Sequence, residues 1–311
     1  MNDLKIMFMG TPDIAAESLR YLIDKGMNIV CAVTQPDKPR GRGHKLMPPE
    51  VKVVAQENGI EVYQPESLKN NELMNVLDEY KPDIIAVVAY GKILPKYVLD
   101  YPGYGCINMH ASLLPKYRGA APVQWSVING EEKTGVTTMK MDAGLDTGDM
   151  LITRETKIGE YETAEELFVR ISNLGAEVLY ETIINIETIT PIPQNHEEHT
   201  YAPMLSKEIA QIDWSQSKEV ISKLICGMNS WPLAYTHYDE EIVKVITAKK
   251  CDEKLNGENG QIIRHDKGKG LLIKCSNGGI WLEIVQFTGG KRMHIDDYLL
   301  GHTIEIGKIL K

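Results

Sequence analysis

Asn108 and His110 are the two residues whose types and spacing most clearly suggest chemistry. They end an apolar run of strand length that begins at Cys106. Successive side chains in a strand alternate between faces, so Asn108 and His110 should project to one side while Ile107 and Met109 pack on the other. An amide N–H and a protonated imidazole can both donate hydrogen bonds. The pair could therefore stabilise an oxyanion and supply a proton.

A further candidate for acid–base chemistry is the loop at 142–149, which follows a predicted strand at 135–141. It holds three aspartates and two glycines, a composition that suggests a calcium site at first sight. The EF-hand pattern needs an oxygen ligand at its third position, where this chain has Gly144. We expect instead a tight loop that directs one carboxylate towards the site.

The surrounding pattern predicts an α/β fold with a doubly wound, mostly parallel sheet. An apolar run at 4–9 is followed by a helix, in which Thr11 fits the N-cap and Pro12 the first turn, and by a strand at 29–33. Such βαβ units favour a parallel sheet, and ligands bind at the carboxyl ends of its strands. A buried strand at 82–89 should end at that same edge.

The composition excludes several classes of protein. The 311 residues are 43% hydrophobic and 25% charged, as in ordinary globular proteins, and no apolar run approaches the roughly 18 residues of a membrane span. The first turn holds only Gly10, where a dinucleotide fingerprint needs three glycines. The N-terminus lacks the pattern of a signal peptide, so we expect a cytoplasmic protein. The five cysteines are scattered, which predicts reduced, mostly buried thiols.

A basic segment at 35–49 stands out in a chain whose net charge is −9. Its four prolines and two glycines predict a long loop without regular structure. Its basic side chains are those of Lys38, Arg40, Arg42 and Lys45. They could form a solvated, mobile connection, but their contrast with the acidic chain favours an arm that contacts phosphates.

The length predicts two domains. We expect a catalytic domain at 1–189, a polar, proline-punctuated linker at 190–205 and a second domain at 206–311. Regular short strands with turn residues between them predict a small β-barrel or sandwich for the second domain, and five strands with one helix suit an OB-like barrel. His196 and His199 lie three residues apart, not four as in a helical zinc motif, so a surface loop is the better interpretation.

Taken together, these motifs resemble the methionyl-tRNA formyltransferases over nearly the full chain. The resemblance rests on the Asn108-x-His110 pair, the Ser112–Gly119 segment, the 142–149 loop, the start at Phe8–Pro12 and the basic segment. It implies a formyltransferase fold, 10-formyltetrahydrofolate as co-substrate, no metal, charged initiator methionine tRNA as acceptor and an OB-like tRNA-binding domain. A monomer is expected.

The resemblance also implies roles for individual residues. Asn108 and His110 would act on the reacting centre, and Asp146 would orient His110 and relay a proton. Folate contacts are expected from Val88, Tyr90, Gly91, Ser112, Leu113, Leu114, Pro115 and Gly119. For Leu113 and Leu114 a place in the core is an equal alternative. The acceptor stem of the tRNA would meet Lys38, Arg40, Arg42 and Lys45.

Two other functions stay open at this point. One is formylation of a small amine, such as glycinamide ribonucleotide or an amino sugar, by the same catalytic domain. The C-terminal domain and the basic segment count against it. The other is an RNA-binding protein without catalysis, against which the presence of Asn108, His110 and Asp146 counts.

Overall fold

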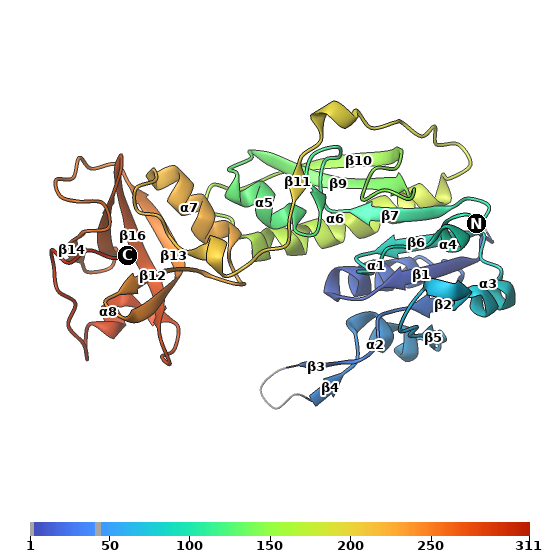
Figure 1. The fold of residues 1–311 in the computed structure, drawn as a ribbon, viewed down its shortest axis with the longest axis horizontal. Helices are drawn as coiled ribbons and strands as arrows, with labels where there is room; N and C mark the ends of the chain where they lie inside the picture. The colour runs from blue at the N-terminus through green and yellow to red at the C-terminus, as the bar shows by residue number, and fades with distance from the viewer. Residues whose placement is uncertain (1–2, 41–44) are drawn as a thin grey trace. The chain divides into compact units, whose positions relative to one another are not determined.

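The computed structural model describes residues 3–40 and 45–311. The chain divides into two compact units (Figure 1). The first unit holds the chain up to Gly119 together with Gly135–Thr156 and Val169–Tyr201. The second holds Ala120–Thr134, Lys157–Phe168 and Ala202–Lys311. No helix of the described residues is long and apolar enough to cross a membrane.

A seven-stranded sheet forms the centre of the first unit. Its order is β10 (Met150–Lys157), β9 (Lys133–Lys140), β7 (Cys106–His110), β6 (Ile84–Val88), β1 (Ile6–Gly10), β2 (Ile29–Val33) and β5 (Val62–Tyr63). The strands from β5 to β7 run parallel, and β9 runs antiparallel to β7. The predicted α/β fold with a mostly parallel sheet is confirmed. Strand β10, which the sequence interpretation missed, extends the antiparallel edge.

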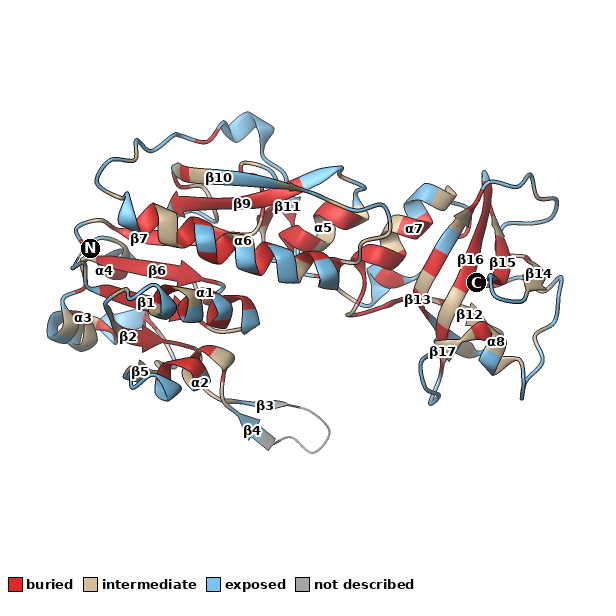
Figure 2. Ribbon diagram, turned by 180° about the vertical axis from the view of Figure 1, so that it is seen from behind, coloured by how far each residue is buried: buried red, intermediate tan, exposed pale blue. Residues whose placement is uncertain are grey.

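Helices cover both faces of this sheet, as Figure 2 shows by their buried sides. One face carries α1 (Asp13–Asp24), α2 (Glu50–Glu57) and α6 (Ala164–Ile184). The rings of Tyr21 in α1 and Tyr180 in α6 pack edge to face, with 6.0 Å between their centroids. The other face carries α3 (Met74–Tyr80), which follows a 3-10 turn η1 (Lys69–Asn71), and α4 (Lys96–Leu99). Leu77 and Val98 of these helices pack in one cluster with Met7 and Cys106.

The register across β6 and β7 decides which way the chemical side chains face. Cys106 pairs with Ile85, and both belong to the cluster under α3 and α4. Met109 packs instead against α6, where it lies so close to Gly175 that a Cβ there would be 2.8 Å from its sulfur. Because side chains alternate along a strand, Asn108 and His110 share the face of Cys106.

The basic segment is partly regular, which corrects the expectation of an irregular loop over 35–49. Strands β3 (Lys38–Arg40) and β4 (Lys45–Met47) pair antiparallel as a two-stranded hairpin. Pro39 is tolerated because both strands of such a ribbon are edge strands, so its missing N–H removes no essential ladder bond. Arg42 and the rest of 41–44 lie outside the described residues.

The second unit is built on an antiparallel sheet. The order is β12 (Ala234–Tyr238), β13 (Glu241–Cys251), β16 (Gly278–Phe287), β15 (Gly270–Cys275) and β14 (Ile262–Asp266), with β17 (Met293–His294) paired to β16. The helical elements are α5 (Pro122–Ile128), η3 (Glu208–Ala210), α7 (Lys218–Gly227) and α8 (Ile295–Tyr298). Helices α5 and α7 pack closely, since a Cβ on Gly227 would lie 2.3 Å from Ile128.

The predicted OB-like barrel is not confirmed, because the pairings among the described strands leave this sheet open between β12 and β14. The C-terminal tail lies across that opening. The N–H of His237 in β12 donates to the carbonyl of Lys311 at 2.6 Å, and the N–H of Ile262 in β14 donates to the carbonyl of Lys308 at 2.8 Å. The side chain of Leu310 between them is 5% exposed.

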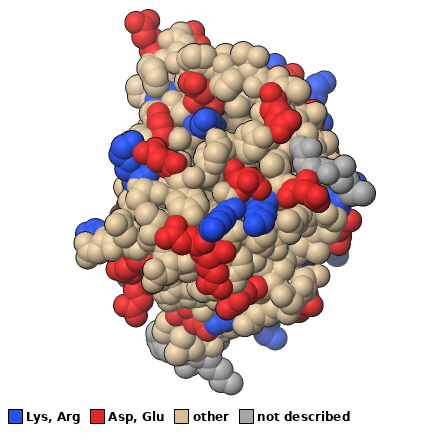
Figure 3. All heavy atoms as spheres, turned by 90° about the vertical axis from the view of Figure 1, so that its right-hand side faces the viewer, with Lys and Arg blue, Asp and Glu red and all other residues tan. Residues whose placement is uncertain are grey.

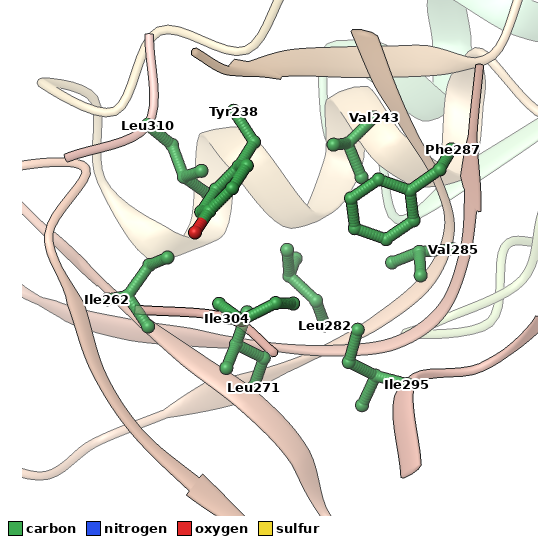
Figure 4. A pocket seen from close by; sticks show the side chains of 10 residues that line it. All are labelled: Tyr238, Val243, Ile262, Leu271, Leu282, Val285, Phe287, Ile295, Ile304 and Leu310. Atoms are coloured by element: carbon green, nitrogen blue, oxygen red, sulfur yellow. The ribbon is translucent and has the colours of Figure 1, made fainter. Parts of the chain in front are cut away.

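The interior of this second sheet is apolar and closely filled. It contains a cavity of about 10 Å³, which has room for at most one water molecule, and Figure 4 shows the side chains that line it. Its lining residues are Tyr238, Val243, Ile262, Leu271, Leu282, Val285, Phe287, Ile295, Ile304 and Leu310. This space belongs to the hydrophobic core and is too small for an organic ligand.

Candidate active site

His110, the last residue of β7, is held by two neighbours. Its Nε2 lies 2.8 Å from the carbonyl oxygen of Tyr117, and its Nδ1 lies 3.7 Å from Oδ2 of Asp146. A carbonyl oxygen only accepts hydrogen bonds, so Nε2 is the donor and Nδ1 is the nitrogen that faces the carboxylate. His110 is only 6% exposed. The imidazole therefore has a fixed orientation at the end of the strand.

Asp146 is aimed at this histidine by the geometry of its loop. Its Oδ2 accepts a hydrogen bond from the backbone N–H of Gly119 at 2.9 Å, and its backbone has a φ of 53°. Asp142 stabilises the turn, because its Oδ1 accepts from the N–H of Gly144 at 2.9 Å and from the hydroxyl of Thr147 at 2.6 Å. The carboxylate directed at the site is therefore that of Asp146.

Glycine is required at the end of the same loop. A Cβ on Gly148 would lie 1.9 Å from the carbonyl oxygen of Lys140, inside any permitted contact. The N–H of Lys140 also donates to the carbonyl of Asp149 at 2.9 Å. The loop thus closes tightly on the end of β9.

Arg118 and Gln194 form a buried pair that the sequence interpretation missed. Arg118 donates to Oε1 of Gln194 from Nε at 3.1 Å and from Nη2 at 2.7 Å, and Nη2 also lies 3.1 Å from Nδ1 of His196. His196 begins the 3-10 turn η2 (His196–Glu198). Because Arg118 and Gln194 are 76 positions apart, no local pattern could have brought them together. The only signal in the sequence was an arginine directly before Gly119.

The end of β6 presents backbone to the site edge. Val88 and Tyr90 are buried, whereas Ala89 and Gly91 between and after them are exposed. Both exposed residues have positive φ, 44° and 82°, a conformation that is uncommon for alanine and concentrates at functional sites. Ala89 was not among the predicted residues, although the alternation with Val88 and Tyr90 could have indicated it.

Tyr90 is anchored through its carbonyl oxygen, which accepts from Oγ1 of Thr11 at 3.0 Å and from Nε2 of Gln35 at 2.9 Å. The prediction that Thr11 is the N-cap of α1 is therefore wrong. The helix begins at Asp13 with Pro12 in the cap position, because the threonine hydroxyl bonds to Tyr90 instead. Burial raises the pKa of the Tyr90 phenol to about 12.

The segment after β7 is largely internal. The hydroxyl of Ser112 donates to the carbonyl of Lys116 at 2.7 Å, and its own carbonyl accepts from Oγ1 of Thr137 at 2.8 Å. Ser112 and Leu114 are buried, whereas Leu113 and Pro115 are half-buried. Ser112 and Leu114 thus stabilise the loop from inside, whereas Leu113 and Pro115 stay partly accessible.

Three of the predicted tRNA-contacting residues, Lys38, Arg40 and Lys45, lie on the hairpin, and Arg42 lies outside the described residues. Lys38 donates from Nζ to Oε1 of Gln35 at 2.8 Å. At the base of the hairpin, Asp37 accepts from Gln64 at 2.8 Å and from Lys52 at 2.9 Å, and these two contacts lower the pKa of the Asp37 carboxyl. Arg40 and Lys45 are opposite each other in the ladder.

Comparisons with known proteins assign the chain to a family. A family model described as formyl transferase matches residues 4–183, and one described as formyl transferase, C-terminal domain, matches 204–303. The chain belongs to the formyl transferase family. It is similar to a methionyl-tRNA formyltransferase of Alkaliphilus oremlandii, with 50% identity over 309 residues and 99% of each chain covered. A protein of the same name from Acetivibrio thermocellus is 47% identical over 310 residues, again 99% of each.

Solved structures share the formyl transferase fold at low identity. An N-formyltransferase from Helicobacter canadensis, in complex with folinic acid and dTDP-3-aminofucose, superposes with a TM-score of 0.67 at 18% identity and covers 93% of this chain and 100% of that one. HypX from Aquifex aeolicus in complex with tetrahydrofolic acid gives a TM-score of 0.61 at 16% identity and covers 99% of this chain and 51% of that one. At these identities the likeness establishes the fold alone.

Proposed function

We propose that this chain transfers the formyl group of 10-formyltetrahydrofolate to the α-amine of methionyl initiator tRNA. The observation that carries the proposal is the contact of His110 with Asp146 at the end of β7, in a chain 50% identical over its full length to a methionyl-tRNA formyltransferase. The reaction breaks the bond from the formyl carbon to folate N10 and forms an amide on the methionyl nitrogen.

The acceptor amine needs little activation. An α-amine has a pKa of about 7.7–8.0, so a useful fraction is neutral near pH 7. The difficult species is the tetrahedral intermediate, in which negative charge collects on the formyl oxygen and N10 leaves readily only when protonated. The site must therefore supply a donor for the oxygen and a proton for the nitrogen.

The geometry supports an assignment of these two tasks. Asn108, two residues before His110 on the same face of β7, would donate its amide N–H to the oxyanion. Nε2 of His110 is already bound to the carbonyl of Tyr117. Nδ1 and Asp146 Oδ2, at 3.7 Å, are too far apart for a direct hydrogen bond, so Nδ1 is the nitrogen that would exchange a proton with the reacting group. Asp146 would accept the proton lost by the amine through water.

We extend the proposal to the binding residues. The edge formed by Val88–Gly91 and by Ser112–Gly119 would hold the folate, with Leu113, Pro115 and the exposed Ala89 and Gly91 as its accessible parts. Ser112, Leu114 and Tyr90 would support this edge from within. Lys38, Arg40, Arg42 and Lys45 of the basic segment would contact the acceptor stem. Their positive charge would attract the phosphates of the tRNA. On the face that Figure 3 shows, acidic and basic side chains are interspersed.

The domain assignment is part of the same proposal: catalysis at 1–189, a connecting segment at 190–205 and tRNA binding at 206–311. We propose that the last of these is an OB-like barrel whose closure comes from the tail at 307–311. Hydrogen bonds from the tail to β12 and β14 support this. We further propose a cytoplasmic monomer.

The test is a formyl-transfer assay with three acceptors: charged initiator methionine tRNA, charged elongator methionine tRNA and glycinamide ribonucleotide. Turnover of the initiator tRNA in strong preference to the others would support the proposal. Turnover of the small amine alone would assign the chain to small-molecule formylation and would overturn the tRNA substrate.

A further inference from the structure

We infer that Gln194 is a positioning residue that holds Asp146 opposite His110. This inference rests on the proposed function, because it concerns the residue to which that function gives the proton relay. Gln194 lies in the segment 190–205, outside the catalytic loops, and the hydrogen bonds of its side chain go to other residues than His110.

The side-chain amide of Gln194 is fully used. Its Nε2 donates to the carbonyl oxygen of Asp146 at 2.9 Å and to that of Gly148 at 2.7 Å. Its Oε1 accepts the two hydrogen bonds from Arg118. Gln194 and Arg118 are 5% and 6% exposed. Four hydrogen bonds thus converge on one buried amide, and two of them end on the loop that carries the carboxylate.

Arg118 decides which way this amide points. A guanidinium only donates, so it fixes Oε1 towards itself and turns Nε2 towards the loop. With the amide flipped, two donors would face Arg118 and an acceptor would face two carbonyls. Asp146 has a positive φ of 53°, which costs a non-glycine residue conformational energy. The hydrogen bonds from Gln194 to the loop carbonyls offset this cost and hold the loop in this conformation.

The same short strand holds both ends of Asp146. In β8 (Arg118–Gly119), the N–H of Gly119 binds the carboxylate, while the side chain of Arg118 acts through Gln194 on the backbone. Strand β8 is itself tied to the segment that carries Gln194, since the N–H of Arg118 donates to the carbonyl of Thr200 at 2.9 Å. Strand β8 pairs there with β11 (Tyr201–Ala202).

It follows that residues 192–200 are a support of the active site and not a mere spacer. Ile192 pairs with Met150 through two backbone hydrogen bonds of 2.8 Å each, at the start of β10. The segment therefore contacts Met150, directly after the carboxylate loop, through Ile192. It contacts the loop itself through Gln194. Any movement of the segment would change the position of Asp146.

The test compares Gln194→Glu with Gln56→Glu in full-length protein. A carboxylate at position 194 would keep the acceptor for Arg118 but lose the donor to the Asp146 loop, whereas Gln56 is exposed on α2 and controls for the added charge. We expect Q194E to lower kcat by about 10-fold to 100-fold, as small misplacements do, with KM for both substrates within about 2-fold. Q56E should leave both unchanged. Gln194→Met, which adds no charge, repeats the test if Q194E unfolds.

A double-mutant cycle separates positioning from a general structural role. If Gln194 acts through Asp146, Q194E should lower kcat by less than about 3-fold in an Asp146→Asn background, because the two effects then overlap. The inference would be overturned if Q194E lowered kcat by the same factor in the Asp146→Asn background as in wild type. An unchanged kcat in both Gln194 variants would also overturn it.

Hydrogen–deuterium exchange tests the inference without any activity. Loss of two hydrogen bonds should raise amide exchange in 142–149 by about tenfold or more, while the sheet of the second unit stays unchanged. This readout remains decisive if the wild-type chain fails to formylate tRNA, which would overturn the proposed function alone. Unchanged exchange in 142–149 would overturn the positioning role.

Discussion

Gly119 donates its backbone N–H to Oδ2 of Asp146 at 2.9 Å, and the same oxygen lies 3.7 Å from Nδ1 of His110. One carboxylate oxygen is thus fixed by the backbone on one side and faces the imidazole on the other. The fixed N–H orients the carboxylate before any substrate binds. A preorganised site of this kind loses little energy to reorganisation during the reaction.

Replacing Asn108 removes the proposed oxyanion donor. Asn108→Ala should lower kcat by about 10²–10³-fold and leave the melting temperature within a few degrees of wild type, because the side chain is half-buried. Steady-state formyl transfer and thermal unfolding check this. Asn185→Ala, an exposed asparagine near the end of α6, is the matched control. Equal rates for the two variants would refute a role for Asn108.

Replacing Gly148 tests the tight closure of the Asp146 loop. A Cβ at this position would meet the Lys140 carbonyl at 1.9 Å, whereas one on Gly103 would have nothing within 4 Å. Gly148→Ala should destabilise the protein by about 1–3 kcal/mol and reduce kcat at least tenfold. Gly103→Ala should change neither. Urea unfolding and the transfer assay measure the two effects, and tolerance of Gly148→Ala would show that the loop is less constrained than this contact implies.

Replacing Leu310 tests the role of the tail in the second unit. Leu310→Ala should cost about 2–5 kcal/mol, as for other buried leucines. The neighbouring Ile309→Ala, at 37% exposure, should cost less than half as much. All four tryptophans lie in the second unit, so tryptophan fluorescence during urea unfolding follows that unit alone. Equal, small losses for both variants would argue against a structural tail.

The thiols of the first unit should resist alkylation. Burial raises the pKa of both Cys31 and Cys106 to about 12, and only the thiolate reacts. At about pH 8, below the ordinary thiol pKa of about 8.5, iodoacetamide should label neither residue in the native protein and both in urea. Peptide mass spectrometry gives the labelled fraction. Rapid labelling of either thiol in the native state would show that the sheet opens at that strand.

Stability of the second unit should depend on Glu219 at neutral pH. Hydrogen bonds from Asn277 and Lys218 lower the pKa of this carboxyl from 4.5 to about 2. A lowered pKa stabilises the fold above about pH 4.5, and this contribution is lost as the pH falls towards 2. Glu219→Gln should therefore destabilise the unit at about pH 7, by less than about 1 kcal/mol because the side chain is half-exposed, and the difference should shrink at about pH 3. Fluorescence-detected urea midpoints at both pH values test this, and a difference that grows at low pH would contradict it.

The parts of the fold that were predictable are those set by local burial. The runs that became β1 and β6 are nearly continuous apolar stretches, and such strands occur where both faces of a sheet are covered. That Asn108 and His110 share one face of β7 followed directly from strand geometry. The cysteines were also predicted to be reduced and mostly buried, and all five are free and buried.

Other features depended on contacts between distant parts of the chain. Thr11 has the residue type of a helix cap, but the carbonyl of Tyr90, 79 positions away, takes its hydroxyl. Pro39 indicated an irregular segment, yet a two-stranded hairpin accommodates it. The pairing of Arg118 with Gln194 required the folded chain, because a polar residue among prolines is typical of a linker.

The most direct test of the proposed chemistry is a single-turnover measurement on initiator tRNA charged with methionine. Wild-type protein and His110→Ala would each be mixed in excess with the tRNA and 10-formyltetrahydrofolate, and formyl-methionine would be quantified over time. We expect transfer by wild type and a rate about 10²–10³-fold lower for His110→Ala, at unchanged tRNA affinity. Equal rates for the two proteins would contradict the assignment of His110 as the proton-transferring group at this site.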